Sequence, residues 1–420
     1  MTSSDFLLIT WQGGGNLPPE LGLARRLIQA GHRVRVLSEP SVEADAKAVG
    51  CQFTSWPTAP AMNPIDRELA AFKDWNLRGR LAAARHPSRL FGFQSLIAHD
   101  VLRTLERHPA DALIIDALAI GAFPAAERAG LPRAAVLPSI YIRPTPGHPV
   151  PGPGWLPAHG PAGRARDVVA PWAMLKLLRL GLPRLNKIRL ELDLPPMNNV
   201  LDMWDHSQRL LVMTSPTFDP PPTTLPDNVR YVGPLTDDPP WAAPWTPPWP
   251  LNTRPFVLVG MSSTYQAQER LLRRLVTVLD GKPLWALVTR GPGLCPGEVV
   301  GTSNVAVADS APHHELLPHA DVFVTHAGHG STIKALAAGT PMVCIPHGRD
   351  QNDNAARVVA AGAGVRLSRR ASDEAISAAI RKVLTDPSYK ANAHRLANAI
   401  AAEATRGPHV VAEVEQLLTR

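Results

Sequence analysis

The chain contains 420 residues, of which 45% are hydrophobic and 19% are charged, which excludes a largely disordered protein and leaves material for two domains. Its formal net charge of +7 comes from scattered Lys and Arg residues, and aromatic residues account for only 5%, so nothing indicates a nucleic-acid-binding surface. Only three cysteines occur and no apolar run reaches about 18 residues, which argues against a disulfide framework, a zinc site and a membrane span. The N-terminus lacks the pattern of a signal peptide, so we expect a cytoplasmic protein.

The first part of the chain alternates between short apolar runs and amphipathic stretches. Residues 6–10 predict a strand, glycines 13–15 a turn, residues 20–30 a helix and residues 34–37 the next strand. Because parallel strands need a crossover helix, this opening indicates a βαβ unit. Further strands are expected over residues 51–55, 113–115 and 134–137, with a helix over residues 121–129.

Two stretches rich in Pro and Gly interrupt this alternation. Residues 144–172 predict a long irregular loop, which we interpret as part of a binding site because long ordered loops are usually functional. Residues 236–250 predict a semi-rigid interdomain linker. Between them, residues 174–192 place Lys and Arg among leucines, a pattern that fits either a solvated helix or contact with an anionic membrane or a lipid.

The alternation restarts after the linker. Strands are expected over residues 256–260, 284–288, 305–308, 321–325 and 342–345, with a helix over residues 268–279. Three helical patterns, separated at Pro387 and Gly407, end the chain. The predicted architecture is α/β, with two Rossmann-like domains whose parallel sheets face each other across a cleft. The expected boundaries are residues 1–235 for the first domain, 236–254 for the linker, 255–405 for the second domain and 406–420 for a helix that packs back toward the first domain.

Residues 320–364 give the clearest indication of a binding site. A strand ends at Thr325 and a helix begins a few residues later, so a helix N-terminus follows the carboxyl end of a strand. Unpaired backbone N–H groups and the positive end of the helix dipole bind anions at such a position, and glycines allow close approach. We therefore expect a diphosphate to bind there without a metal ion, held by His326, Gly328, Gly330, Ser331 and Thr332.

Two further polar residues follow the next strand. Asp350 and Gln351 come after residues 342–345 and a turn, so they should lie at the same edge of the sheet. Carboxylate and amide groups there suit the hydroxyl groups of a sugar. Several histidines lie between residues 313 and 329, but no Cys or carboxylate completes a ligand set, so we expect loop and surface histidines rather than a metal site.

Residues 320–364 resemble the donor-binding signature of the family-1 glycosyltransferases, which include plant secondary-metabolite enzymes and bacterial macrolide and glycolipid enzymes. The resemblance implies a GT-B fold and transfer of a sugar from a nucleoside diphosphate. It assigns the diphosphate to His326 and the glycine loop after it, and the sugar to Asp350 and Gln351. The Ala-, Arg- and Pro-rich composition favours a bacterial member of the family.

The resemblance also covers the nucleotide side of the site. Ser263 or Thr264 would face the nucleotide. Ser310 stands where the family often has an aromatic residue that stacks on the base, and His313 stands where it has a glutamine. Lys334 stands where plant members have a glutamate that contacts the ribose. UDP and dTDP are therefore both expected nucleotides.

Residues 13–34 resemble the family's first loop and helix, in which a histidine near the helix start deprotonates the acceptor hydroxyl. Asn16 stands at that position, and its amide can hold an acceptor oxygen but has no useful basicity. Asp116 matches the aspartate that steers this histidine, so we expect it to take the proton directly or through a water. Without the resemblance, a helix cap or a buried structural carboxylate is the alternative for Asp116. The early glycines do not form GxGxxG, so no dinucleotide cofactor is expected.

These expectations combine into one reaction. A hexose or deoxyhexose passes from a UDP or dTDP sugar to a hydrophobic small-molecule or lipid acceptor bound under residues 144–172, with inversion and without metal or cofactor. Two alternatives are a catalytically impaired sugar-nucleotide-binding protein, indicated by Asn16, and a sugar-nucleotide epimerase on the same scaffold. The expected partners are the donor and the acceptor, with no nucleic acid. We expect a monomer or homodimer whose surface is compatible with peripheral contact at the inner membrane face.

Overall fold

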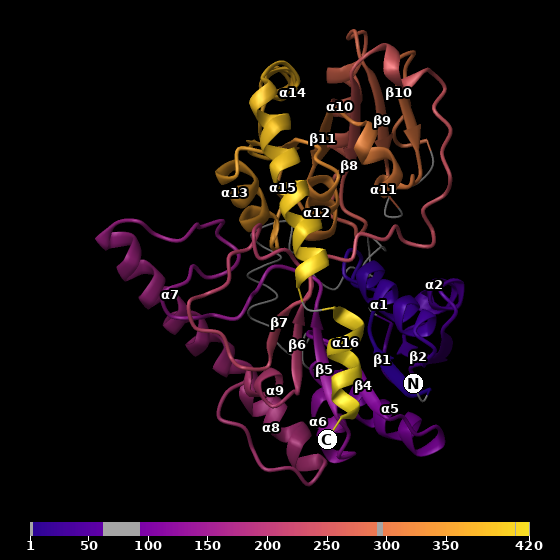
Figure 1. Cartoon of the computed structure of the whole chain (residues 1–420), viewed down its shortest axis with the longest axis vertical. Coiled ribbons are helices and arrows are strands. Elements are labelled where there is room, and N and C mark those ends of the chain that lie inside the picture. Colours follow the sequence, from indigo (N-terminus) through magenta and orange to yellow (C-terminus); the bar gives the residue numbers. More distant parts are fainter. Residues whose placement is uncertain (1–2, 62–92, 292–296, 408, 420) are drawn as a thin grey trace.

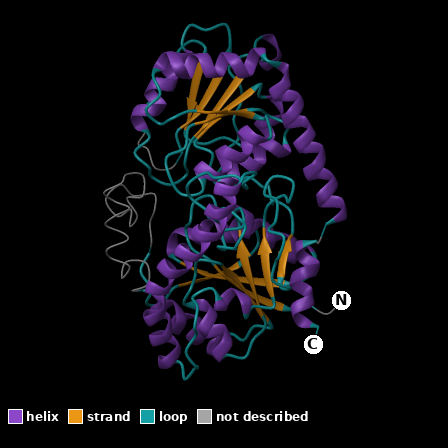
Figure 2. Cartoon of the chain, turned by 90° about the vertical axis from the view of Figure 1, so that its left-hand side faces the viewer, coloured by secondary structure: helices purple, strands orange, loops and turns teal. Residues whose placement is uncertain are grey.

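The computed structural model describes residues 3–61, 93–291, 297–407 and 409–419. Two lobes are stacked along the long axis of the molecule, and each contains a parallel β-sheet flanked by helices (Figures 1 and 2). This arrangement confirms the predicted α/β architecture with two Rossmann-like domains.

The first sheet has seven parallel strands in the order β3-β2-β1-β4-β5-β6-β7. Their bounds are β1 (Asp5–Ile9), β2 (Arg33–Ser38), β3 (Gln52–Ser55), β4 (Ala112–Asp116), β5 (Arg133–Leu137), β6 (Arg209–Val212) and β7 (Val229–Tyr231). The central strands β4 and β5 are buried along their whole length, as parallel strands covered by helices on both faces must be. Asp116 is the last residue of β4, at the edge that faces the other lobe.

Helices cover both faces of this sheet. The helices of the first lobe are α1 (Leu17–Gln29), α2 (Glu43–Ala48), α5 (Gln94–Arg107), α6 (Ala122–Arg128), α7 (Pro161–Leu178), α8 (Leu182–Glu191) and α9 (Asp202–Asp205), of which α7 projects away from the sheet. Phe6 and Leu8 of β1 share one core with α1, and Leu7 and Ile9 share another with α5, α6, α8 and α9. Successive side chains of a strand point to opposite faces, so this alternation identifies the two packed layers.

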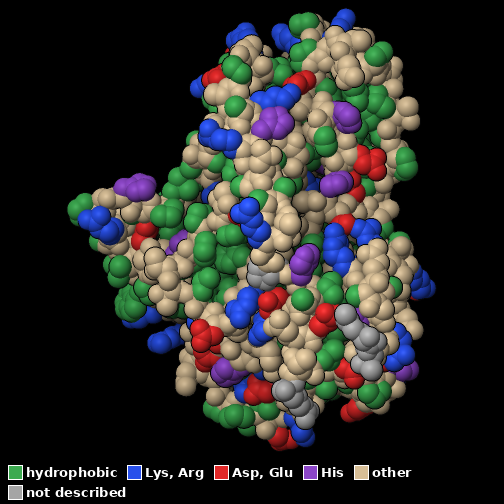
Figure 3. Space-filling view, viewed as in Figure 1, with side chains coloured by type: hydrophobic (Ala, Val, Ile, Leu, Met, Phe, Trp, Pro, Cys, Tyr) green, Lys and Arg blue, Asp and Glu red, His purple; other side chains and the backbone are tan. Residues whose placement is uncertain are grey.

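Helix α7 corrects the expectation of an irregular loop over residues 144–172. Most Pro and Gly residues of that stretch lie before Pro161, where a proline in the first turn of a helix costs no hydrogen bond, and Gly163 and Pro171 lie within the helix. The helix projects from the first lobe, and Figure 3 shows hydrophobic atoms along this projection. Its exposed apolar side chains are Val168, Val169, Trp172 and Leu177. Helix α8 is instead anchored by the buried Leu185 and Ile188, as expected of a solvated helix packed by its leucines.

The second sheet has six parallel strands in the order β10-β9-β8-β11-β12-β13. Their bounds are β8 (Phe256–Gly260), β9 (Trp285–Thr289), β10 (Val305–Ala308), β11 (Val322–Thr325), β12 (Met342–Cys344) and β13 (Gly364–Arg366). The helices of this part are α10 (Glu269–Leu279), α11 (His313–Leu316), α12 (His329–Ala337), α13 (Gln351–Ala360), α14 (Asp373–Thr385) and α15 (Pro387–Arg406). Helices α10 and α14 share one core layer, and α12, α13 and α15 share the other.

Several sets of contacts join the lobes. Helix α15 runs from the second lobe toward the first, and α16 (Val410–Glu415) then packs on the first sheet through Val410 and Val414 (Figure 1). In the other direction, Ile140 and Phe218, which lie next to strands of the first sheet, belong to the core of the second. Within the described residues, no helix combines the length and apolar character that crossing a bilayer requires.

Candidate active site

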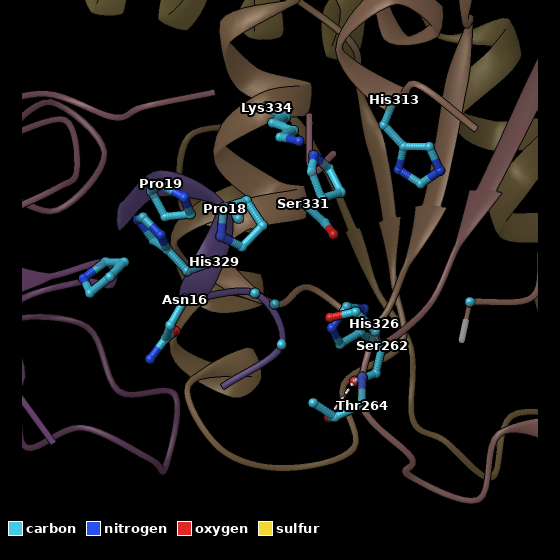
Figure 4. Close-up of a pocket in the computed structure, with 18 of the residues that line it drawn as sticks. Asn16, Pro18, Pro19, Ser262, Thr264, His313, His326, His329, Ser331 and Lys334 are labelled. Carbon is cyan, nitrogen blue, oxygen red and sulfur yellow. Dashed lines mark hydrogen bonds between the residues drawn. The ribbon is translucent and has the colours of Figure 1, made fainter. Parts of the chain in front are cut away.

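A pocket lies between the two lobes, where the carboxyl ends of both sheets meet. The first lobe lines it with the loop between β1 and α1, which includes Asn16. The second lobe lines it with the residues after β8 and with the start of α12. Figure 4 shows Asn16, Pro18 and Pro19 on one side of this space and Ser262, Thr264, His326 and Ser331 on the other. Ligands of parallel α/β sheets bind at such strand ends.

The start of α12 is shaped for an anion. Strand β11 ends at Thr325, Ala327 adopts a left-handed conformation with φ of 64°, and Gly328 occupies the N-cap of the helix. A side chain on Gly328 would place its Cβ 2.5 Å from Nε2 of His326, so glycine lets the imidazole lie against the turn. The N–H groups of a first helical turn lack helical partners and carry the positive end of the dipole. This end of α12 therefore presents donors to the pocket.

His326 is neutral at physiological pH. Burial, together with the nearby His347 and Arg349, lowers the pKa of its imidazole to about 3. A neutral imidazole carries one N–H donor and one acceptor nitrogen. His326 thus contributes a hydrogen-bonding group, and not a fixed charge, to the pocket wall.

Arg349 brings a cation to the same wall, which the sequence analysis did not anticipate. It has φ of 54°, and its Nη1 donates to Oγ1 of Thr264 at 3.1 Å. Oγ of Ser262 lies 2.9 Å from the same Thr264 hydroxyl. Arginine is suited to phosphate recognition because its planar fork presents several donors. The sequence could have indicated Arg349 through its position directly before Asp350 and Gln351.

Asp350 and Gln351 line the pocket at the start of α13. Oδ2 of Asp350 accepts a hydrogen bond from Nδ2 of Asn354 at 2.8 Å, and burial raises the pKa of the Asp350 carboxyl group. Oε1 of Gln351 accepts the backbone N–H groups of His347 and Gly348 at 2.7 and 3.0 Å. Gln351 therefore holds the turn before α13 together, and this turn presents Asp350.

The glycine loop of the first lobe touches the second lobe directly. Gly14 has φ of 70°, and a side chain there would clash with Cγ2 of Thr264. A Cβ on Gly330 would lie 3.5 Å from the backbone oxygen of Gly15. Asn16 occupies the N-cap of α1, and within the described residues its side chain makes no capping hydrogen bond. The amide of Asn16 is thus available to the pocket.

Most of the predicted site residues are brought together. Those that line the pocket are Asn16, Ser263, Thr264, Ser310, His313, His326, Gly328, Gly330, Ser331, Asp350 and Gln351. Nε2 of His313 lies 3.1 Å from Oγ1 of Thr289, and burial lowers the pKa of His313 to about 4. Pocket residues that the sequence analysis did not assign to the site include Asp238, Trp241, His329, Lys334 and Arg349.

Two predicted residues, Asp116 and Thr332, do not line the pocket within the described part of the chain. Thr332 is fully buried inside the first turn of α12, where its N–H bonds to the oxygen of Gly328 at 2.9 Å. Asp116 is 1% exposed, and its Oδ1 accepts the N–H of Leu118 at 2.6 Å. The structure therefore gives Asp116 no direct path to a proton in the pocket.

The environment of Asp116 explains its burial. Asp116 lies beside the carboxyl group of Glu20 of α1, and burial raises the pKa of Asp116. Burial and the charge of Asp116 raise the pKa of Glu20 well above its usual range. The hydroxyl of Thr10 donates to Oε2 of Glu20. The pair thus joins the end of β4 to the helix that follows Asn16.

Comparisons with known proteins agree with this geometry. Residues 298–417 match the family model of the erythromycin biosynthesis protein CIII-like C-terminal domain. The chain is 30% identical to 4'-demethylrebeccamycin synthase of Lentzea aerocolonigenes, over 94% of this chain and 95% of that protein. It is 25% identical to zeaxanthin glucosyltransferase of Pseudescherichia vulneris, over 87% of this chain and 86% of that protein.

Solved structures share the complete fold. The glycosyltransferase of kitacinnamycin superposes with a TM-score of 0.76 at 21% identity, with 100% of both chains covered. CalG4, the calicheamicin glycosyltransferase, gives a TM-score of 0.74 at 20% identity, with 100% of this chain and 99% of that chain covered. These neighbours confirm the GT-B fold. Together with the sequence relatives, they show that the chain belongs to the bacterial family-1 glycosyltransferases.

Proposed function

We propose that this protein transfers a hexose or deoxyhexose from a UDP or dTDP sugar to a hydrophobic small-molecule or lipid acceptor, with inversion and without a metal ion. The observation that carries this proposal is the start of α12, where His326 and Gly328 line the pocket between the lobes. Relatives that transfer sugars to natural products support this proposal, among them the demethyllactenocin mycarosyltransferase of Streptomyces fradiae, 29% identical over 46% of this chain. The spinosyn rhamnosyltransferase SpnG, a fold neighbour with a TM-score of 0.68, was solved with thymidine diphosphate.

The diphosphate would bind at the start of α12. The backbone N–H groups of the first turn, the imidazole of His326 and the guanidinium of Arg349 converge on this wall of the pocket. As the bond between the anomeric carbon and the phosphate oxygen breaks, negative charge builds on the diphosphate. Donors and a cation that are already in place stabilise that charge without reorganising. This arrangement supports leaving-group activation without a metal ion.

The acceptor would approach from the first lobe. Its oxygen attacks the anomeric carbon from the face opposite the diphosphate, while Asp350 and Gln351 hold the sugar hydroxyl groups. Asn16 would accept a hydrogen bond from the acceptor hydroxyl and orient it, because an amide cannot take the proton. The proton would leave to water as the new bond forms. Asp116, paired with Glu20, would position the start of α1 and thereby Asn16.

Calorimetric titration with UDP, dTDP and GDP, with and without chelator, tests the donor site. We expect one of these nucleotides to bind equally well in chelator. Incubation of the matching sugar nucleotide with candidate acceptors should then give a glycoside of inverted anomeric configuration, read by proton NMR coupling constants. Binding of none of the three nucleotides would contradict the proposal, and a rearranged donor formed without acceptor would indicate epimerisation instead.

His326→Ala should weaken diphosphate binding and the transfer rate together. A hydrogen bond to a charged group contributes about 1.5–3 kcal/mol, which corresponds to a roughly 10- to 150-fold loss. His319→Ala is the matched control, because His319 is exposed and does not line the pocket. Unchanged binding and rate in the His326 variant would remove this residue from the diphosphate site.

A further inference from the structure

The linker between the lobes also lines the pocket. Residues 232–255 connect β7 to β8, and Asp238, Pro239 and Trp241 from this segment face the pocket with the residues of both lobes. A linker that served only as a spacer would have no reason to contribute an acidic and an aromatic side chain to a binding site. Each of these two side chains has a specific partner in the second lobe.

Asp238 is held beside α12. Nζ of Lys334 donates to its Oδ1 at 2.7 Å, and the backbone N–H of His314 donates to its Oδ2 at 2.9 Å. The side chains of Lys334 and Asp238 are only 12% and 16% exposed, so the carboxylate is fixed in place and shielded from bulk water. An ionised carboxylate has about four acceptor sites, so these two bonds leave capacity for hydroxyl donors from a ligand.

Trp241 is held beside Ser310 through its backbone. The hydroxyl of Ser310 donates to the oxygen of Trp241 at 3.2 Å and accepts the N–H of Ala243 at 3.2 Å. Trp241 remains 39% exposed while lining the pocket. Within the described residues it makes no ring stacking or cation contact, unlike Trp245, which stacks on Phe256. An indole face is thus left available at the pocket.

The position of these groups along α12 indicates which part of a ligand they meet. Lys334 lies five residues after His329, the first residue of the helix, so its Cα lies roughly 7.5 Å along the axis from the start of α12, and its side chain reaches Asp238 from there. That separation is beyond the phosphates themselves and matches the next group of a nucleotide, the ribose. Ser310, which anchors Trp241, belongs to the same wall of the pocket.

We propose that the linker completes the nucleoside half of the site: the indole of Trp241 stacks on the base, and the Asp238 carboxylate accepts hydrogen bonds from the ribose hydroxyl groups. This inference rests on the proposed sugar-nucleotide function. Ser310 offers no aromatic ring to the pocket, but the linker places Trp241 next to it. Lys334 offers no carboxylate, but the linker places Asp238 next to it. Prolines 239 and 240 between the two side chains restrict the backbone that carries them.

The linker itself offers matched controls. Trp249 stacks on Trp285 with ring centroids 5.0 Å apart and does not line the pocket. Asp237 precedes Asp238 but binds Arg25 and Arg26 of α1. Substitutions at Trp249 and Asp237 therefore disturb linker packing without touching the pocket.

The experiment is calorimetric titration of each variant with UDP, dTDP and inorganic pyrophosphate. Stacking on an aromatic side chain contributes about 1–3 kcal/mol per base, so Trp241→Ala should weaken binding of the nucleotide that wild type binds by roughly 5- to 150-fold. Binding of pyrophosphate should not weaken, Trp241→Phe should recover part of the loss, and Trp249→Ala should bind as wild type does. Quenching of tryptophan fluorescence by the nucleotide should be smaller in Trp241→Phe than in wild type.

Asp238→Asn should weaken nucleotide binding by about tenfold, the effect of losing roughly 1.4 kcal/mol of charge-assisted hydrogen bonding. Pyrophosphate binding should not weaken, and Asp237→Asn should bind nucleotide as wild type does. If the Trp241 and Asp238 variants both bind nucleotide as tightly as wild type does, the inference is overturned and the proposed function stays intact. Equal losses for nucleotide and pyrophosphate would also overturn it. Failure of wild type to bind any nucleotide would contradict the proposed function itself.

Discussion

An ion pair buried between the lobes shows how strongly they are joined. Asp219 lies between β6 and β7, and its Oδ1 accepts hydrogen bonds from Nε and Nη2 of Arg357 in α13 at 3.0 and 2.7 Å. Its Oδ2 accepts the N–H of Tyr141 at 2.7 Å. The side chains of Asp219 and Arg357 are 0% and 9% exposed, so water does not replace a lost partner.

We expect Asp219→Asn to lower the free energy of unfolding by about 3–5 kcal/mol, because the amide keeps the shape of the side chain but leaves the Arg357 charge buried without an anion. If the 420 residues unfold cooperatively, an unfolding entropy of about 2.1 cal/mol/K per residue gives roughly 0.9 kcal/mol/K for the chain. The Tm measured by differential scanning calorimetry should therefore fall by roughly 3–6 °C.

A double variant separates the cost of an unpaired charge from the loss of packing. Combining Asp219→Asn with Arg357→Met removes both charges and should bring the Tm back to within about 2 °C of wild type. Lys47 and Glu43 form an exposed pair with side chains 62% and 49% exposed, so Lys47→Ala should shift the Tm by less than about 1 °C. A double variant whose Tm falls by the sum of the two single shifts would refute this reasoning.

Two further predictions concern the first loop and the carboxyl pair. Gly14→Ala should cost roughly 1–2 kcal/mol from its left-handed backbone alone and should displace Thr264, so nucleotide binding weakens, whereas Gly160→Ala, which meets open space outside the pocket, should leave binding unchanged. Equal binding by both variants would show that the lobes do not touch there in solution. Glu20→Gln should become relatively more stable as pH rises. A carboxyl group whose pKa is raised by folding, as that of Glu20 is beside Asp116, stabilises fully below its unfolded pKa of about 4.5 and progressively less as pH rises toward its folded pKa. Thermal denaturation at pH 5 and pH 8 measures this, and parallel shifts of wild type and variant would contradict it.

Local patterns were sufficient to predict the strands and to bring together several residues that line the pocket. The apolar runs around β1, β4, β8 and β11 are buried strands in the structure, because a parallel strand covered on both faces needs a continuous apolar sequence. His326, Gly328 and Asp350 were predicted together because two successive strand, turn and helix segments, β11 with α12 and β12 with α13, place them at the ends of neighbouring parallel strands. Their arrangement depends mainly on residues that are close in the chain, so it could be predicted from the sequence.

Other features depend on contacts between distant parts of the chain and could not be predicted from the sequence. Asp116 matched a catalytic pattern, yet its carboxyl group is buried beside Glu20 of a separate helix and does not line the pocket. Asp238 and Trp241 looked like part of a proline-rich spacer until Lys334 and Ser310 proved to hold them at the pocket. Periodicity and motif spacing report which face of an element is apolar and which groups adjoin a turn. They do not report which residues far away in the sequence desolvate a carboxylate or bring a linker side chain to the pocket, because those contacts exist only once both sheets have packed.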